Sequence, residues 1–235
     1  MANDILTYVL EGNIATVVMD DGKANALSEA MIDGLSGAID RAEREASALV
    51  ITGRKDRFCA GFDLRVMMSS PEAAKALLRQ GSALLMKLYG AKVPLVMACT
   101  GHALAGGALV LLTGDVRVGA RGAFKIGLNE VSIGMPVPVL AMELARDRLD
   151  VRELGPATLE SRIYAPDDAA KAGYLDIVVA EEEVRARATA EATRLTSLAK
   201  GPYAATKERL RGRTIKHVND TLESDMASLL TPAGK

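Results

Sequence analysis

The stretch "TGHALAGGALVLLTGD", residues 100–115, says most about the architecture, because it joins a buried strand to a short apolar helix through glycine. The strand before it is PLVMAC (94–99), and the pair Gly106 and Gly107 opens a helix that we expect over 106–114. Backbone N–H groups at a helix N-terminus have no partner within the helix, so they suit a phosphate or an oxyanion. The stretch lacks both the GxGxxG fingerprint and the P-loop lysine, which argues against nucleotide binding. Taken alone, tight packing of helix on sheet explains the glycine pair equally well.

Around this stretch, strands and helices alternate over about the first 135 residues, and the remainder is mainly helical. Ser28 precedes an amphipathic helical pattern, and Pro71 stands at a natural first helical position. We expect strands at 5–10, 14–19, 48–52, 94–99, 115–120, 123–126 and 175–180, and helices from Ser28 to Ala42 and at 71–90, 106–114, 137–149, 151–163, 167–173, 181–200 and 202–230. This order predicts an α/β core followed by a helical C-terminal region.

Composition excludes several classes of function. The chain has 235 residues, a net charge of −1 and 3% aromatic residues, so we expect no nucleic acid and no membrane as partner. Cys59 and Cys99 belong to no CxxC pair and the two histidines lie far apart, which predicts buried free thiols and no metal site. The sequence MANDILTYVLEG lacks the pattern of a signal peptide, so we expect a cytoplasmic protein.

Two further segments are candidates for chemistry. In "ITGRKDRFCAGFDL" (51–64), small residues follow a buried strand and a charged turn, which lets a ligand approach the backbone. An ordinary glycine turn is the alternative for this segment. In "FKIGLNEVSIGMP" (124–136), a single acid, Glu130, stands among apolar and small residues. Burial raises a carboxyl pKa, so such a Glu can act as a base near neutrality, unless it faces solvent or pairs with a cation such as Arg146.

Together these segments resemble the crotonase (enoyl-CoA hydratase/isomerase) superfamily, over nearly the whole chain. The motifs that carry the resemblance are NAL (25–27), AGFDL (60–64), GHALAGGAL (101–109), IGLNEVSIGMP (126–136), AAKAGYLDIVV (169–179) and PYAATKERLR (202–211). The resemblance implies an α/β spiral of β-β-α units over 1–180 and a helical region over 181–235 that drives assembly into a homotrimer or a dimer of trimers. It also implies an acyl-CoA substrate, with coenzyme A as part of the substrate and no separate cofactor.

The resemblance further implies the residues of the site. In that family two backbone N–H groups hold the thioester oxygen, and by motif these belong to Phe62 and Gly106. An enolate oxygen would lie between them, and removing one such donor typically costs ~10²–10³ in rate. The residues implied to line the substrate are Lys23, Ala24, Ala26, Ala60, Gly61, Asp63, Leu64, Leu109 and Asn129.

The acid positions bear on the reaction. Hydratases of this family use two glutamates, one of them three residues after the oxyanion glycine, where this chain has Leu109. The other position holds Glu130. This pattern resembles the Δ3,Δ2-enoyl-CoA isomerases, in which one Glu follows GLN and an apolar residue replaces the other acid. We therefore expect Glu130 to be the sole acid and base, moving a double bond into conjugation with the thioester.

Other interpretations stay open at this point. A hydratase or another crotonase reaction would need a second acid such as Asp63, whose alternative role is to fix the oxyanion loop. A non-catalytic acyl-CoA-binding paralogue is the other class, and Ala105, where many members have a third Gly, gives it some support. Cys59 as a nucleophile lacks an evident activating histidine. His102 either touches substrate or caps a strand end, and the basic residues in 207–216 either bind coenzyme A phosphates of a neighbouring subunit or form a solvated face.

Overall fold

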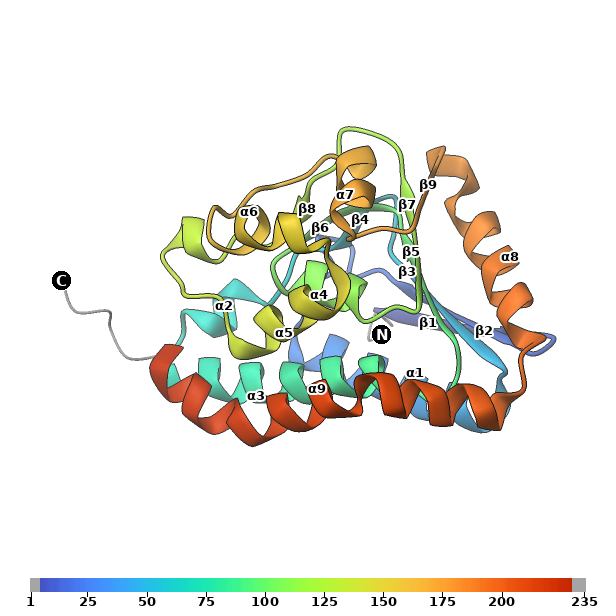
Figure 1. The fold of residues 1–235 in the computed structure, drawn as a ribbon, viewed down its shortest axis with the longest axis horizontal. Helices are drawn as coiled ribbons and strands as arrows, with labels where there is room; N and C mark the ends of the chain where they lie inside the picture. The colour runs from blue at the N-terminus through green and yellow to red at the C-terminus, as the bar shows by residue number, and fades with distance from the viewer. Residues whose placement is uncertain (1–4, 230–235) are drawn as a thin grey trace.

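The protein is described by a computed structural model over residues 5–229. Within that range the strands form a six-stranded sheet, in the order β1-β2-β3-β5-β7-β9, and a three-stranded sheet, β4-β6-β8 (Figure 1). The strands are β1 (Leu6–Glu11), β2 (Ile14–Met19), β3 (Ala48–Thr52), β4 (Asp56–Cys59), β5 (Leu95–Cys99), β6 (Gly101–Leu104), β7 (Val116–Ala120), β8 (Ile126–Gly127) and β9 (Ile177–Val179). The α-helices are α1 (Glu29–Glu45), α2 (Leu64–Met67), α3 (Pro71–Tyr89), α4 (Gly106–Leu112), α5 (Val139–Arg148), α6 (Leu154–Thr158), α7 (Pro166–Ala172), α8 (Val184–Thr196) and α9 (Lys200–Leu229), and short 3₁₀ turns lie at Val131–Ile133, Val151–Glu153 and Glu181–Glu183.

The strand order confirms the predicted spiral of β-β-α units. Each of the pairs β3–β4, β5–β6 and β7–β8 sends its first strand to the large sheet and its second to the small sheet. These strands pair in parallel, whereas β1 and β2 form an antiparallel hairpin. Helices follow β4 and β6, so each turn of the spiral brings the chain back to the same two sheets. The ends of β4, β6 and β8 consequently meet along one edge.

The helices form where the apolar spacing and the caps predict them. The Ser28 side chain accepts from the Met31 N–H at the start of α1, and Ser70 caps α3 just before Pro71 in the same way. Helix α1 buries one face, made of Met31, Ile32, Leu35, Ala38, Ile39 and Ala42. All six residues are those of the predicted apolar face.

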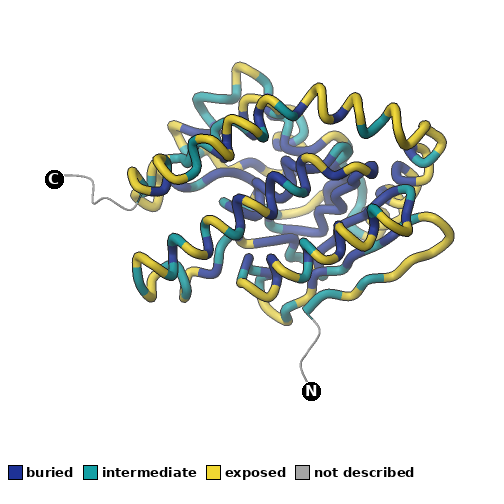
Figure 2. The backbone as a smooth tube through the Cα atoms, turned by 90° about the horizontal axis from the view of Figure 1, so that it is seen from below, coloured by how far each residue is buried: buried dark blue, intermediate teal, exposed yellow. Residues whose placement is uncertain are grey.

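Helices cover both faces of the large sheet. Helix α8 packs on one face against β3, β5 and β7, where Val50, Val96 and Val118 meet Val184 and Ala188. The main core fills the other face beneath α1 and α3, and α9 lies along α3 and α5 (Figure 1). Figure 2 shows the buried residues gathered on the inner sides of the helices and in the sheet between them. The domain boundary at residue 180 stays a prediction.

Four of the expectations about strands and helices were wrong. The charged turn after β3 contains a strand, β4, and the glycine-rich stretch begins with another, β6. Both are short and half polar, so their sequences lack the alternation that predicts a strand. They are stabilised by pairing with each other. Helix α6 ends at Thr158, because Leu159 is exposed and the chain turns to pair Tyr164 with Ile126. The strand expected at 123–126 is confined to β8.

The remaining differences are small. The helix expected at 106–114 ends at Leu112, and the one expected at 181–200 is a 3₁₀ turn followed by α8. Residue 230, the expected end of the last helix, lies outside the described residues. Among residues 5–229, no helix is both long and apolar enough to cross a membrane.

Candidate active site

Two loops that are far apart in the sequence, a first loop at residues 24–27 and a second loop at residues 60–63, lie side by side at the site. The Leu27 N–H donates to the Gly61 carbonyl at 2.8 Å, and the Asp63 N–H donates to the Leu27 carbonyl at 3.3 Å. The Ala60 N–H donates to the Ala24 carbonyl at 3.1 Å. In such a parallel bridge the N–H of the middle residue, Phe62, points away from its partner strand. The Phe62 N–H is therefore available to a ligand.

Asn25, a residue that the sequence reasoning gave no role, holds the first of these loops. It is fully buried at φ +53°, and its amide donates to the Met19 carbonyl at 3.0 Å and the Phe58 carbonyl at 3.1 Å. The Asp21 carboxylate accepts from the N–H groups of Lys23 and Asn25. Asn is enriched in this left-handed region, so "NAL" carried a structural signal.

The second loop approaches the start of α4 closely. A Cβ on Gly61, which has φ +95°, would lie 3.2 Å from the Gly106 nitrogen. A Cβ on Gly106 would lie 3.1 Å from the Phe62 ring, and one on Gly81 in α3 would lie 2.2 Å from it. The glycines therefore make room for the Phe62 ring and bring the two predicted oxyanion donors together. The Gly106 N–H belongs to the first turn of α4, where donors have no partner within the helix.

Ala105, just before α4, has a strained backbone. Its φ of +49° and ψ of −124° lie in a region that glycine adopts readily and alanine does not. Hydrogen bonds on both sides hold it there: its N–H donates to the Gly127 carbonyl at 3.0 Å, and its carbonyl accepts from the Leu109 N–H at 3.1 Å. Strain of this kind is found where the surrounding structure requires one backbone direction, and here the strained residue directly precedes the Gly106 N–H.

The segment that bears Glu130 begins at β8, beside the same glycine turn. Leu104 in β6 pairs with Gly127, so the chain that leads to Glu130 runs beside the glycine turn. Glu130 is only 6% exposed, and its Oε2 atom has no hydrogen-bond partner within the described part of the chain. Burial raises the pKa of this carboxyl. Arg146, the cation considered as its partner, pairs with Glu143 instead.

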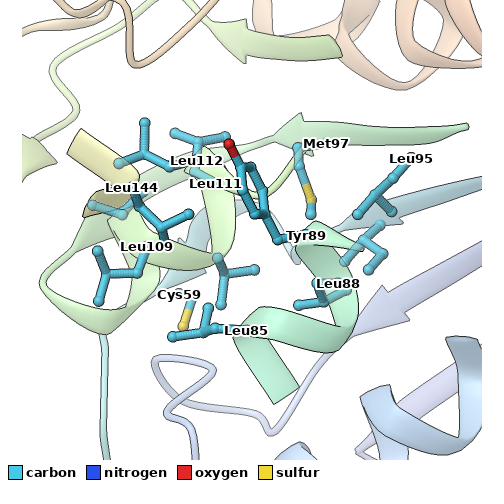
Figure 3. Close-up of a cluster of buried hydrophobic side chains, with 14 of the residues drawn as sticks. Cys59, Leu85, Leu88, Tyr89, Leu95, Met97, Leu109, Leu111, Leu112 and Leu144 are labelled. Atoms are coloured by element: carbon cyan, nitrogen blue, oxygen red, sulfur yellow. The ribbon is translucent and has the colours of Figure 1, made fainter. Parts of the chain in front are cut away.

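Leu109, at the position of the second hydratase acid, belongs to the core. It is 2% exposed on α4 and lies in an apolar cluster with Cys59, Leu85 and Leu144 (Figure 3). A leucine there neither gives nor takes a proton. Helix α4 therefore contributes no acid to the site at residue 109.

Asp63 has a structural partner. It caps α2 by accepting from the Arg65 N–H at 3.0 Å, and its Oδ2 lies 2.8 Å from the Arg65 guanidinium. The hydrogen bond from Arg65 lowers the pKa of the Asp63 carboxyl. Such an acid is ionised and engaged, which fits the loop-fixing role.

Cys59 and His102 also have structural surroundings. Burial raises the pKa of the Cys59 thiol to about 12, so it carries little nucleophilic thiolate near neutrality. His102 accepts the Lys125 N–H on Nδ1 at 3.0 Å and packs edge-on against Phe124. Among residues 5–229, no group of three or more His, Cys, Asp and Glu side chains is arranged to hold a metal ion.

The other predicted substrate contacts lie around these segments. Lys23, Ala60 and Leu64 are exposed, and Ala24, Ala26 and Asn129 are half-buried. The Arg54 guanidinium donates to the Lys23 carbonyl at 2.8 Å and so ties the rim of the first loop to the turn after β3. The structure thus brings together all three segments that the sequence singled out, with exposed groups outside and Glu130 inside.

Comparison with known proteins places this geometry in a family. The chain matches the enoyl-CoA hydratase/isomerase family over residues 10–231. It is 26% identical to human mitochondrial enoyl-CoA delta isomerase 1 over 223 residues, which are 93% of this chain and 74% of that protein. It is 30% identical to a probable enoyl-CoA hydratase of Rhodobacter capsulatus over 208 residues, 87% of this chain and 79% of that protein.

The solved structures agree with the sequence comparison. An enoyl-CoA hydratase/isomerase family protein from Pseudomonas syringae matches with a TM-score of 0.94 at 37% identity, covering 96% of this chain and 98% of that one. The relatives carry both names, isomerase and hydratase. The match over almost the whole chain, the spiral fold and the three converging segments show that this protein belongs to the enoyl-CoA hydratase/isomerase family, in the crotonase superfamily.

Proposed function

We propose that the protein is a Δ3,Δ2-enoyl-CoA isomerase in which Glu130 is the only acid and base. The observation that carries this proposal is the buried Glu130 carboxyl, whose Oε2 atom has no hydrogen-bond partner among residues 5–229. Leu109 stands at the position expected for the other acid. One carboxylate is enough to shift a double bond. Hydration, in contrast, needs a water molecule to be held and activated, and the family's hydratases use two acids for it.

The proposed reaction begins with the thioester oxygen between the N–H groups of Phe62 and Gly106. Glu130 takes a proton from C2 of the 3-enoyl thioester, and the electrons of that C–H bond form a dienolate. The dienolate oxygen accepts hydrogen bonds from both N–H groups. The carboxylic acid then returns the proton at C4. The double bond moves from C3–C4 to C2–C3, where it is conjugated with the carbonyl, and no atom is gained or lost.

Burial suits Glu130 for both halves of this reaction. An unperturbed carboxylate is a weak base, whereas a carboxyl with a raised pKa is stronger as a base and still able to donate. The apolar surroundings also keep out water that would otherwise add to the conjugated product.

The proposal extends to substrate and assembly. Coenzyme A would enter as part of the substrate and lie along the backbone of 60–64 and beside Lys23, Ala24 and Ala26, while the acyl chain would pass Leu109 and Asn129. We expect no separate cofactor, and assembly into a homotrimer or a dimer of trimers. The cytoplasmic location stays a prediction.

Hydration is the second candidate, and one observation favours it: the Rhodobacter capsulatus relative is named a probable enoyl-CoA hydratase. Asp63, the candidate named for the second acid, is engaged with Arg65. A non-catalytic acyl-CoA-binding protein is the remaining alternative. The unpaired carboxyl argues against it, because a buried polar group without a partner costs stability and is retained where function requires it.

A paired assay separates these functions. Purified protein is given 3-hexenoyl-CoA and, separately, 2-hexenoyl-CoA, and the absorbance of the conjugated thioester is followed. The isomerase proposal expects absorbance to rise with the first substrate, and with the second only the partial fall of the reverse reaction, with no gain in product mass. A product of the second substrate that is heavier by one water molecule would establish a hydratase, and thioester binding without turnover of either would establish a binding protein.

A further inference from the structure

A buried tyrosine belongs to the surroundings of Glu130. Within residues 5–229, the buried polar atoms without a hydrogen-bond partner include Asn129 Oδ1, Glu130 Oε2 and the Tyr174 hydroxyl. The Tyr174 side chain is fully buried, although a phenol in a core normally finds a partner. A polar group kept unpaired in a core lowers stability, so its retention calls for a role.

The fold carries Tyr174 to the segment that bears Glu130. Ile126 in β8 and Tyr164 exchange backbone hydrogen bonds of 3.0 and 2.9 Å, so the chain around Tyr164 lies beside the start of that segment. The Tyr174 ring packs on the Tyr164 ring with centroids 5.5 Å apart. The Tyr174 N–H donates to the Ala169 carbonyl at 2.8 Å, which fixes its backbone at the end of α7.

The electrostatics agree with this placement. Burial is the main cause of the raised pKa of the Tyr174 phenol, and the charges of Tyr164 and Glu130 act in the same direction, whereas the backbone of Leu128 opposes them. The phenol is therefore neutral and able to donate a hydrogen bond. Among the described residues, no charged side chain contributes to the raised pKa of Glu130, which is opposed by its own backbone N–H.

We propose that Tyr174 is a positioning residue for Glu130: the neutral Tyr174 hydroxyl donates a hydrogen bond to the Glu130 carboxylate across one water molecule. This inference rests on the proposed function, in which Glu130 moves the proton. A donor to the ionised carboxyl favours the ionised form, so Tyr174 would oppose the effect of burial and keep Glu130 available as a base near neutrality. The same hydrogen bond would also hold the carboxyl in one orientation toward the substrate.

Tyr174→Phe, which removes only the hydroxyl, tests the inference. Tyr164→Phe is the matched control, because the Tyr164 ring belongs to the same pair but its hydroxyl donates to Glu153 at 2.8 Å. One readout is the acid limb of kcat/KM against pH for the 3-enoyl substrate. The other is the infrared carbonyl band of protonated Glu130, assigned by its loss in Glu130→Gln. The second readout needs no turnover.

We expect Tyr174→Phe to move the acid limb up by about one pH unit, because one hydrogen bond to the ionised carboxyl is lost. The infrared titration should move by the same amount, and Tyr164→Phe should leave both unchanged. Titrations that match the wild type in Tyr174→Phe, or that move equally in both variants, would overturn the inference. Full activity in Glu130→Gln would instead refute the proposed function, and the infrared titration would still decide the role of Tyr174.

Discussion

Asp115 and Glu130 are both largely buried carboxyl groups, but their surroundings differ. The Asp115 side chain is 10% exposed, accepts from the Leu95 N–H at 2.7 Å, and pairs with Lys207 and with Arg211, the latter at 2.9 Å. Glu130 is buried to a similar degree, and its Oε2 atom has no partner in the described part of the chain. Burial alone therefore does not distinguish these two carboxyl groups, whereas pairing does.

The Asp115 cluster and the predicted oxyanion donor Gly106 lie at opposite ends of one helix. Arg211 donates to the Thr113 carbonyl at 3.2 Å, next to the C-terminus of α4, while the N-terminus of α4 presents the Gly106 N–H. The paired cluster thus ties α9 to the far end of the helix that carries the predicted oxyanion donor. A network of paired charges suits this supporting role, and a carboxyl oxygen without a partner among the described residues suits proton transfer.

The largest expected effect is on catalysis. Glu130→Gln keeps the size of the side chain but cannot accept the C2 proton, so we expect the isomerisation rate to fall by about 10³-fold or more. The rate of absorbance gain with 3-hexenoyl-CoA measures this. The exposed acid Glu160 provides the control, because Glu160→Gln should keep the wild-type rate. Equal rates in the two variants would remove Glu130 from the chemistry.

The paired cluster should respond in stability. Asp115→Asn leaves Lys207 and Arg211 buried without their counter-charge, so we expect the free energy of unfolding to fall by about 3 kcal/mol. Urea denaturation measures the loss. Asp220→Asn, which breaks an exposed pair with Lys216, should change stability by about 0.5 kcal/mol or less. Similar losses in both variants would show that Asp115 has no special supporting role.

Glu130→Gln should have the opposite effect on stability, with a defined pH dependence. The folded-state pKa of Glu130 is raised by burial, so the wild type matches the variant at acidic pH and loses stability relative to it as pH rises through the folded pKa. Each unit by which the pKa is raised corresponds to about 1.4 kcal/mol. Melting temperatures of both proteins from acidic to mildly alkaline pH measure this. A constant difference across that range would argue against the unpaired state.

The smallest effect concerns the strained turn. Ala105→Gly relieves the positive φ at some cost in chain entropy, so we expect a gain of about 1 kcal/mol in the free energy of unfolding, with activity retained. Ala103→Gly, in the buried strand β6, should lower stability instead. Thermal unfolding of both variants measures the contrast, and a loss of stability in Ala105→Gly would show that the backbone there is unstrained.

Local patterns in the sequence predicted the α/β core and its main helices, because caps and apolar spacing are short-range. The spiral was predicted from the resemblance to the family. Strands β4 and β6 escaped prediction, since four residues with polar members become strands only by pairing with each other. The alternative that Glu130 faces solvent or pairs with Arg146 could be rejected only when the position of Arg146 was known.

The supporting residues of the site were the hardest to predict. Asn25 and Tyr174 have ordinary neighbours in the sequence, and their surroundings come from segments far away along the chain. The left-handed preference of Asn was the one local signal for the first. For Tyr174 no local signal exists, because an unpaired hydroxyl is defined only by what the folded chain places around it.

The most informative experiment follows a label from C2 to C4. A 3-enoyl-CoA carrying deuterium at C2 is converted in ordinary water under single-turnover conditions, and the product is analysed by mass spectrometry and deuterium NMR. If the buried Glu130 carboxyl carries the proton in both steps, part of the deuterium will appear at C4, because that carboxyl is shielded from exchange. Complete solvent hydrogen at C4 would mean that a second, solvent-connected group delivers the proton, and the account based on one unpaired carboxyl would be wrong.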